Sequence, residues 1–428
     1  MLDVKWIRAH QAEVEYAARH KGIEVSIPEL LELDEVRRSR LAEIEALRQS
    51  RNALTEEIGM LLKQGDQPEA ARKKQAVKDI HLRLNDLEAA YRLTDQAYTA
   101  AMQRVPNPVS PDTPAGQSDK DNIELYRAGT LPDFTFEPKD HVALGNLHRM
   151  IDIPRGVKTA GPRHYYLTGA GVLLHRAVQQ LALDLLTEKG FMPVDVPLMA
   201  REEALLNTGY FPLGEDQTFK LADEDKWLVG TSEVPLVSYY SNEIVDLAEP
   251  IKMAAVSLCF RSEVGSAGRD VHGLYRVHQF AKVEQVIICE NSLEKSDELL
   301  REITKNAEEL MRLLELPYRV VAVCCGDMGQ KTYKQVDIET WMPSRNAYGE
   351  THSSSNLLDF QARRSNIRYR NAEGRLTYAY TLNNTAVASP RILIPLLENH
   401  QQEDGSIRIP EALRKYMNGI GEIRAVHE

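Results

Sequence analysis

The sequence predicts an α+β protein with an N-terminal antiparallel two-helix coiled-coil arm, followed by a domain built on a mostly antiparallel sheet flanked by helices. Three observations lead to this prediction. Residues 27–104 contain almost no helix breakers and are rich in Leu, Ala, Glu, Arg and Lys. Residues 104–122 have the proline-rich, polar composition of a linker. Beyond them, strand-like segments predominate over two strongly helical ones.

The arm is predicted from apolar residues that recur at alternating spacings of three and four. The first run comprises Leu30, Leu33, Ile44, Leu47, Leu54, Ile58 and Leu61, with Arg37, Arg40 and Arg51 at intervening seam positions, and a second run extends from Val77 to Ala101. Gly65 and Pro68 separate the two runs, and these residues typically stop one helix and start the next. The second helix must therefore fold back on the first.

The charge of the arm leaves its role open. It carries 13 Lys or Arg and 14 Asp or Glu, yet Arg72, Lys73, Lys74 and Lys78 cluster just after the predicted turn. One interpretation is a solvated coiled coil used for dimerisation or spacing. The other interpretation is an arm that binds the phosphate backbone of a nucleic acid.

Length and composition restrict the class of protein. A chain of 428 residues suggests two domains, with a boundary near residue 120. The net charge of −11 argues against indiscriminate coating of nucleic acid. No apolar run exceeds six residues and no secretory signal is visible, so we expect a cytoplasmic protein. The four cysteines, at 259, 289, 324 and 325, lack metal-site or redox spacing and are expected to be small buried hydrophobes.

The second domain is predicted to contain helices at 171–189 and 293–314. Strands are predicted at 191–197, 251–263, 273–289, 319–325 and 335–341. Neither a Walker-type phosphate loop nor a dinucleotide fingerprint is present.

One segment carries residues suited to nucleotide chemistry. Residues 259–263 read as a strand, residues 264–273 as a Gly-rich charged loop, and residues 275–284 as a returning strand. Arg261 offers a fixed guanidinium fork for phosphate oxygens, and Phe280 can cover a purine ring. By themselves, Arg and Glu alternating on a strand more often form a cross-strand ion pair than a binding site.

Five ordered segments extend this observation along the chain. They are Pro197 after the helix and strand of residues 171–196, residues 231–236 (TSEVPL), residues 260–263 running to 278–280, residues 353–356 with 359–364, and residues 382–383 with Arg391. Together they resemble the class II aminoacyl-tRNA synthetases, and specifically seryl-tRNA synthetase of the bacterial and organellar type. The resemblance covers essentially the whole chain and implies that the arm holds the long variable arm of the serine tRNA.

The resemblance implies the site residues. Catalytic roles fall to Arg261 and Arg391. ATP binding is implied for Arg261, Ser262, Glu263, Val277, Phe280, Glu350, Thr351, His352, Ser353 and Arg391. Serine binding is implied for Thr231, Ser232, Glu233, Arg261, Glu284, Asn383 and Thr385, with Glu284 at the ammonium group and Thr385 at the hydroxyl. Glu350 and Ser353 would bind Mg²⁺, and Arg48, Arg51, Arg72, Lys73, Lys74 and Lys78 would contact tRNA.

The implied activity is ATP-dependent ligation of L-serine to tRNA(Ser) through seryl-adenylate, by a homodimer without membrane association. Residues 1–120, with the hairpin at 27–104, would bind tRNA, and residues 121–428 would form the catalytic domain. Carboxylate attack on the α-phosphorus needs alignment and charge stabilisation rather than a nucleophilic side chain, and two arginines with a metal ion supply both.

The third family motif departs from its usual pattern. Asn384, Ala386 and Pro390 stand where the family usually has glycine, so we expect a tighter pocket or a reshaped loop there. His352 replaces a commonly small residue in the metal loop. Two alternatives follow: a specialised paralogue serving a secondary pathway or conferring inhibitor resistance, and a non-catalytic synthetase-like RNA-binding protein.

Overall fold

The computed structural model describes residues 1–264 and 272–425 and divides the chain into two compact units. One unit comprises residues 2–19 and 23–105. The other comprises Met1, residues 20–22 and the described residues from 106 onward.

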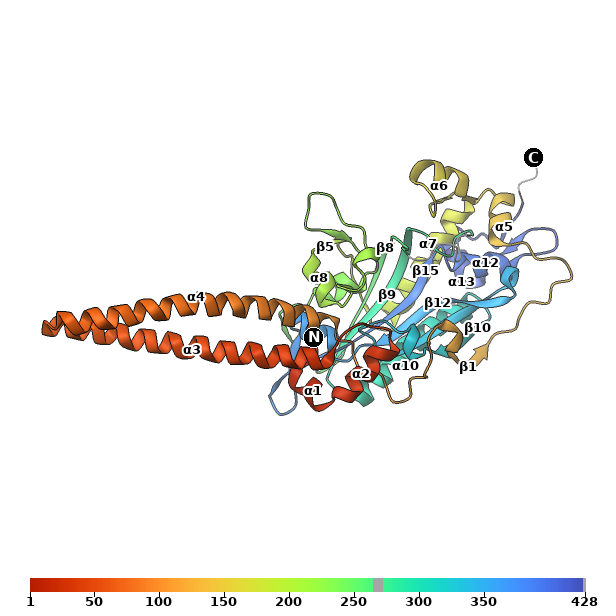
Figure 1. Ribbon diagram of the computed structural model, residues 1–428. Helices are drawn as coiled ribbons and strands as arrows, with labels where there is room; N and C mark the ends of the chain where they lie inside the picture. Colours follow the sequence, from red (N-terminus) through yellow and green to blue (C-terminus); the bar gives the residue numbers. More distant parts are fainter. Residues whose placement is uncertain (265–271, 426–428) are drawn as a thin grey trace. The chain divides into compact units, whose positions relative to one another are not determined.

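The first unit contains the predicted hairpin. It begins with α1 (Val4–Ala9) and α2 (Gln11–His20), followed by the two long helices α3 (Ile27–Gln64) and α4 (Gln67–Arg104), which lie side by side (Figure 1). Gly65 ends α3 with a φ of 82°, and the Asp66 side chain accepts a hydrogen bond from the Glu69 amide at the start of α4. Ion pairs join Arg37 to Asp95 at 3.3 Å and Arg48 to Glu88 at 2.8 Å, so residue numbers rise along α3 as they fall along α4. The helices therefore run antiparallel, which confirms the prediction.

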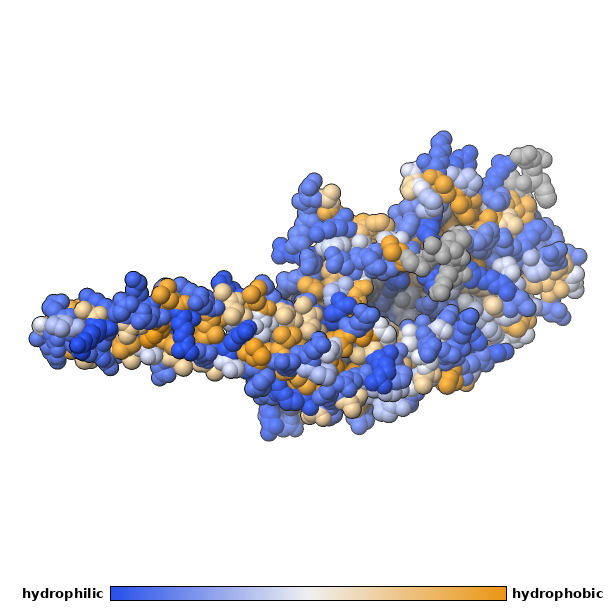
Figure 2. Space-filling model, viewed as in Figure 1, coloured by the Kyte–Doolittle hydropathy of each residue, from blue (hydrophilic) through white to orange (hydrophobic). Residues whose placement is uncertain are grey.

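Two of the three arginines predicted at the helix seam, Arg37 and Arg40, have acceptors on the opposite helix, whereas Arg51 donates to the neighbouring Asn52 side chain. Arg37 pairs with Asp95 at 3.3 Å, and its guanidinium lies 4.3 Å from the centre of the Tyr98 ring. Arg40 donates to the carbonyl of Ala90 at 2.9 Å. The visible face of the hairpin carries both hydrophilic and hydrophobic patches (Figure 2). Since charged groups need partners when they leave water, these contacts explain how a coiled coil accommodates guanidinium groups at its seam.

The second unit is built on an eight-stranded sheet (Figure 1). In spatial order its strands are β1 (Ile123–Ala128), β10 (Tyr318–Ala322), β11 (Lys334–Met342), β12 (Ala347–Asn356), β15 (Tyr380–Ser389), β9 (Gln279–Cys289), β8 (Ile251–Phe260) and β4 (Met192–Pro193). Every neighbouring pair is antiparallel except β4 and β8. The predicted mostly antiparallel sheet is confirmed.

Helices cover both faces of this sheet. On one face, α7 (Ala170–Glu188) and α10 (Leu293–Leu313) bury a large apolar core with alternate strand residues such as Val283 and Ile287. On the other face, α9 (Glu233–Ser238) and α11 (Phe360–Ser365) pack on the intervening residues, including Val286 and Ile288. Adjacent residues of β9 therefore point to opposite layers.

Shorter elements complete this unit. The helices are α5 (His141–Leu147), α6 (Ile153–Ala160), α8 (Glu202–Asn207), α12 (Leu393–His400) and α13 (Glu411–Arg414), with 3₁₀ turns η1 (Asp119–Asp121), η2 (Glu215–Gln217), η3 (Cys325–Asp327), η4 (Pro343–Arg345) and η5 (Lys415–Met417). The small strands are β2 (Ile151–Asp152), β3 (Tyr166–Leu167), β5 (Met199–Ala200), β6 (Trp227–Leu228), β7 (Ile244–Val245), β13 (Arg368–Arg370), β14 (Leu376–Tyr378), β16 (Ile407–Arg408) and β17 (Glu422–Ile423).

Four predicted strands are shorter than the sequence pattern suggested. β8 ends at Phe260 rather than at residue 263, and β10 ends at Ala322 rather than at residue 325. Of residues 191–197, only Met192–Pro193 is a strand, and the Val194 amide adds one bond to the carbonyl of Ala254, at 2.8 Å. Pro197 lacks the amide hydrogen that a longer ladder would require. In the segment 273–289, β9 begins at Gln279. The amide of His278 instead donates to the carbonyl of Arg163, at 3.2 Å.

Two composition-based expectations can be compared with the described residues. All four cysteines are free and buried, as predicted for small hydrophobes in the core. Within residues 1–264 and 272–425, no helix combines the length and the apolar character needed to cross a membrane.

His352 belongs to the core rather than to a ligand surface. Its β12 position pairs with Ile338, which faces the α7 and α10 layer, and the imidazole is 1% exposed. Its Nδ1 lies 2.8 Å from the Thr351 hydroxyl. Burial lowers the pKa of His352 to about 3.

We predict that burial of His352 makes the protein less stable in acid. Between pH 6.5 and 3 the imidazole binds a proton in the unfolded chain but stays neutral in the folded protein. As the pH is lowered through this range, the free energy of unfolding therefore decreases, by up to about 1.4 kcal/mol per pH unit. His352→Ala removes this contribution, although its cavity lowers stability at pH 7. Urea unfolding at pH 7, 6 and 5 measures the slopes. Equal slopes in the wild type and the variant would contradict the prediction.

Candidate active site

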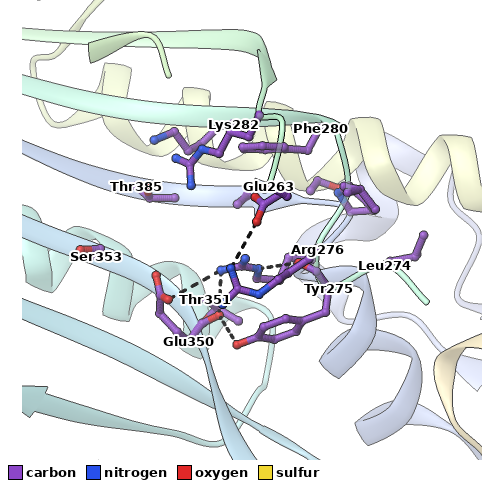
Figure 3. Close-up of a pocket in the computed structure, with 16 residues that line it drawn as sticks. Glu263, Leu274, Tyr275, Arg276, Phe280, Lys282, Glu350, Thr351, Ser353 and Thr385 are labelled. Carbon is purple, nitrogen blue, oxygen red and sulfur yellow. Dashed lines mark hydrogen bonds and ion pairs between the residues drawn. The ribbon is translucent and has the colours of Figure 1, made fainter. Parts of the chain in front are cut away.

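A pocket opens between the central strands of the second unit (Figure 3). Strands β9, β12 and β15, together with the segments that follow β8 and β15 and precede β9, supply its walls. It is lined by Arg261, Glu263, Leu274, Tyr275, Arg276, Val277, Phe280, Lys282, Glu350, Thr351, Ser353, Thr385, Ala388, Ser389, Pro390 and Arg391. Most of the residues implied for ATP binding are thus gathered in one place.

Arg261 and Phe280 face each other across adjacent strands. The Arg261 guanidinium lies 5.3 Å from the centre of the Phe280 ring, and its Nε donates to the carbonyl of Gly230 at 3.4 Å. The backbone amide of Arg261 donates to the backbone carbonyl of His278, at 3.0 Å. This arrangement holds a cation and an aromatic face side by side, which suits a phosphate joined to a purine nucleoside.

Glu263 occupies an unusual backbone conformation. Its φ is 52°, a left-handed value that costs a non-glycine residue of the order of 1 kcal/mol. Its carboxylate pairs with Arg276 at 3.3 Å across the pocket (Figure 3). The sequence left open whether this segment forms an ion pair or a site. The structure forms an ion pair between Glu263 and Arg276 within the lining of the pocket.

Arg391 and Glu350 are connected through Tyr275. The Arg391 guanidinium lies 4.5 Å from the centre of the Tyr275 ring, and its Nε donates to the Tyr275 carbonyl at 3.2 Å. Both Arg391 and the Tyr275 hydroxyl donate to the carbonyl of Glu350, each at 3.3 Å. The Glu350 carboxylate is left half-exposed in the pocket, 3.9 Å from Arg391.

Glu350 and Ser353 offer two oxygen donors from one strand. Gln335 donates to the Ser353 hydroxyl at 3.0 Å and thereby fixes its position. The described residues contain no group of three or more His, Cys, Asp or Glu side chains that could hold a metal ion. Mg²⁺ commonly binds through one or two protein oxygens and completes its shell with water and substrate phosphate. The donor set at Glu350 and Ser353 therefore fits magnesium.

Next to the pocket residues Lys282 and Thr385 lies a buried carboxylate, Glu284. It is 1% exposed and accepts hydrogen bonds from Lys282 at 2.6 Å and from the Thr385 hydroxyl at 3.2 Å. Burial raises its pKa despite the neighbouring ammonium group. Since Lys282 and Thr385 line the pocket, Glu284 lies directly beside it.

A second buried carboxylate, Glu233, gathers donors that sequence analysis missed. Lys331 contacts both of its oxygens, at 2.6 and 2.7 Å, and Tyr210 and Gln361 donate to it at 2.9 and 2.7 Å. Asn383 donates to it at 2.9 Å. Burial is the largest influence and favours the neutral acid, but Lys331 and the other donors together hold the pKa of Glu233 below its ordinary value. Tyr210 and Lys331 lie outside the segments that carry the family resemblance. Gln361 lies within one of them, residues 359–364, but the resemblance assigned it no role.

Several residues implied for binding lie outside the pocket lining. The Ser262 hydroxyl donates to the carbonyl of Asp216 at 2.6 Å, and Ser232 is completely buried. Thr231 is also buried and accepts a hydrogen bond from the amide of Glu233 at 3.3 Å. The expectation that His352 contacts ATP is not supported, because alternation along β12 turns its side chain into the opposite layer.

The expectation that Asn384 narrows the pocket is wrong. Thr385 and Asn383 face the pocket side of the sheet, so Asn384 between them faces α10. Its amide accepts from Gln285 at 2.6 Å and donates to Ser354 at 2.8 Å. Ala386 also packs in the α7 and α10 core. Of the three departures from the family pattern, Pro390 alone lines the pocket among the residues that the structure describes.

Comparison with protein families matches both parts of the chain. Residues 1–109 match the seryl-tRNA synthetase N-terminal domain, and residues 218–400 match the tRNA synthetase class II core domain (G, H, P, S and T). The second match includes the strands that build the pocket.

Individual proteins are similar over almost the full chain. The serine–tRNA ligase of Deinococcus radiodurans is 43% identical, covering 98% of both chains, and that of Brucella abortus is 41% identical, covering 99% of both. The structure of seryl-tRNA synthetase from Pyrococcus horikoshii complexed with ATP has a TM-score of 0.90 and 37% identity, with full coverage of both chains. The cytoplasmic enzyme of Naegleria fowleri in complex with AMP has a TM-score of 0.86 and 25% identity, covering 100% of this chain and 99% of that one. On the combined strength of its fold, its pocket and these full-length similarities, the chain belongs to the seryl-tRNA synthetase family.

Proposed function

We propose that this protein ligates L-serine to tRNA(Ser) in an ATP-dependent reaction that passes through seryl-adenylate. The observation that carries the proposal is the arrangement of the pocket. Two arginines, Arg261 and Arg391, lie at its nucleotide end, and the buried Glu284 lies beside Thr385 at the other. The related ligases and the ATP and AMP complexes of similar structures support the same activity.

The nucleotide is proposed to lie on Phe280, with its α-phosphate at Arg261 and its γ-phosphate at Arg391. A carboxylate oxygen of serine then forms a bond to the α-phosphorus, while the bond from that phosphorus to the bridging oxygen breaks and pyrophosphate leaves. Both arginines stabilise the negative charge that develops on the phosphate oxygens. Magnesium held by Glu350 and Ser353 would neutralise further phosphate charge.

Serine is proposed to bind at the Glu284 end. Its ammonium group would replace the Lys282 ammonium as a partner of Glu284, and its hydroxyl would contact Thr385. Thr231, Glu233 and Asn383 would complete the pocket. Both oxygens of Glu233 are bonded, to Lys331, Tyr210, Gln361 and Asn383. The Lys282 and Thr385 contacts of Glu284 both go to its Oε2, so Glu284 is the carboxylate better placed to receive the serine ammonium group.

The long hairpin is proposed to bind the variable arm of the tRNA. Arg72, Lys74 and Lys78 are exposed on α4, where Arg72 pairs with Glu69 of the same helix at 3.6 Å. Arg48 and Lys73 instead pair across the hairpin with Glu88 and Glu57. The exposed cations are therefore the better candidates for phosphate contacts. We also propose, from the family resemblance, that residues 1–120 serve tRNA binding, that residues 121–428 serve catalysis, and that the protein acts as a homodimer.

The two alternative functions have less support. The specialised paralogue was suggested by a narrowed pocket, yet Asn384 and Ala386 point away from it. A non-catalytic module has no need to keep Glu233 and Glu284 buried near a pocket that is lined by two arginines, since such groups are costly to bury.

We predict serine-dependent ATP–pyrophosphate exchange with magnesium in the absence of tRNA. Arg261→Ala should lower the exchange rate at least about a hundredfold, because one preorganised charge donor at the α-phosphate is lost. Arg155→Ala, at an exposed arginine outside the pocket, is the matched control and should retain wild-type exchange. A wild-type protein that binds ATP without exchange would favour the non-catalytic alternative.

We predict that replacing Arg72, Lys74 and Lys78 by alanine weakens tRNA binding and leaves serine activation unchanged. The slope of log affinity against log salt should become shallower by about 0.7–0.9 for each lost phosphate contact. Titration of tRNA at several salt concentrations measures this slope. A variant lacking the exposed cations Lys120, Lys158 and Arg424 controls for net charge, and an equal loss in that variant would refute a specific role for the hairpin.

We predict that Lys331→Met destabilises the second unit by about 3–5 kcal/mol, because it leaves Glu233 buried without its cation. Adding Glu233→Gln should recover at least half of this loss, since no buried charge then remains. Denaturant unfolding of the wild type, both single variants and the double variant gives the coupling energy. Additive losses would show that the Lys331 contact contributes little.

A further inference from the structure

A completely buried carboxylate lies outside the pocket. Glu398, on α12, is 0% exposed and accepts three hydrogen bonds. Its Oε1 accepts from the His141 backbone amide at 3.0 Å and lies 2.9 Å from the His141 ring Nδ1, and its Oε2 accepts from the Ser344 amide at 3.0 Å. One carboxylate therefore joins α5, α12 and the η4 turn.

The hydrogen-bond pattern identifies the His141 tautomer. Because the carboxylate accepts at Nδ1, that nitrogen carries a proton. The other nitrogen, Nε2, lies 3.2 Å from the amide nitrogen of Leu274 and accepts its hydrogen. Both ring nitrogens of this buried imidazole thus make hydrogen bonds. Nδ1 donates to Glu398, which orients the ring, and Nε2 accepts from the backbone amide of Leu274.

The chain segment that precedes Leu274 packs closely against the His141 ring. Gly273 has a φ of +69°, and a Cβ atom there would lie 1.9 Å from the His141 Nε2. Glycine is therefore required for the approach. In the same segment, the His272 Nε2 lies 3.0 Å from the carboxylate of Asp140, which also caps α5. Residues 272–274 are consequently held against the start of α5.

The anchored segment leads directly into the nucleotide end of the pocket. Leu274 is followed by Tyr275, whose carbonyl orients Arg391 and whose hydroxyl donates to the Glu350 carbonyl. The Tyr275 ring also lies 4.2 Å from the guanidinium of Arg345, the residue after Ser344. Glu398 thus fixes the backbone before Tyr275 and the backbone before Arg345, the two residues that pack together beside Arg391.

We propose that His141 and Glu398 form a positioning pair for the nucleotide site, acting through Leu274 and Tyr275 on Arg391 and Glu350. The inference rests on the proposed function, since it assigns the affected end of the pocket to ATP. The pair contacts none of the residues assigned to serine. Its loss should therefore impair use of ATP and leave use of serine nearly unchanged.

Two substitutions of His141 separate its two hydrogen bonds. A Gln side chain reaches about as far as Nε2 and can still accept from Leu274, whereas Asn reaches only to about Nδ1 and can donate to Glu398 alone. In ATP–pyrophosphate exchange, His141→Asn should raise the KM for ATP about tenfold or more and change the KM for serine less than twofold. His141→Gln should stay within about threefold of the wild type for both substrates.

A matched control and a second variant keep the test independent of folding. His148 is also buried and bonds the Gly405 carbonyl, and neither residue lines the pocket, so His148→Asn should not raise the KM for ATP selectively. Gly273→Ala retains both members of the pair but displaces the segment, and should reproduce the ATP-specific effect.

Equal kinetics for the Asn and Gln variants, or parallel rises in both KM values, would overturn the proposal. Absence of exchange in the wild type would instead overturn the proposed function.

Discussion

The register among β9, β12 and β15 is the constraint on which the site depends. Thr385 pairs with Glu284, and Asn384 pairs with both Gln285 and Ser354. Because side chains alternate across a sheet, this pairing places one set of residues in the pocket and the next set under α10. A slip of one residue would exchange Thr385 for Asn384 in the pocket and bury the wrong groups on both faces.

The layer beneath the pocket helps to fix that register. Gln285 donates to Asn384 at 2.6 Å and accepts from Asn306 of α10 at 2.9 Å, while Ser354 contacts both Asn384 and Thr304. These groups are buried and bonded to one another, so a change of pairing would leave amide groups without partners. The asparagine that departs from the usual family pattern is therefore part of a polar network joining three strands to a helix.

Next to this hydrogen-bonded layer, ion pairs hold the side chains around the pocket in place. Two lysine–glutamate pairs, Lys282 with Glu284 and Lys331 with Glu233, lie where water has been excluded. Such pairs contribute little net stability compared with apolar packing, but each makes removal of one partner costly. The Arg391 side is organised differently, through the backbone contacts of Tyr275 and the anchoring of Leu274 by His141. Ion pairs thus orient the residues at the Glu284 end of the pocket, and hydrogen bonds that involve the backbone orient those at the Arg391 end.

The sequence by itself determined the hairpin, the mostly antiparallel sheet and the family, because heptad spacing, turn residues and ordered motifs are local signals. It also named Arg261, Phe280, Glu350 and Arg391, which the fold gathers around one pocket. Tertiary structure alone decided which face His352 and Asn384 occupy, since a β-bulge and strand register set the direction of a side chain. It alone also brought Lys331 to Glu233 and His141 to Leu274, because partners 98 and 133 residues apart meet only when the chain is packed.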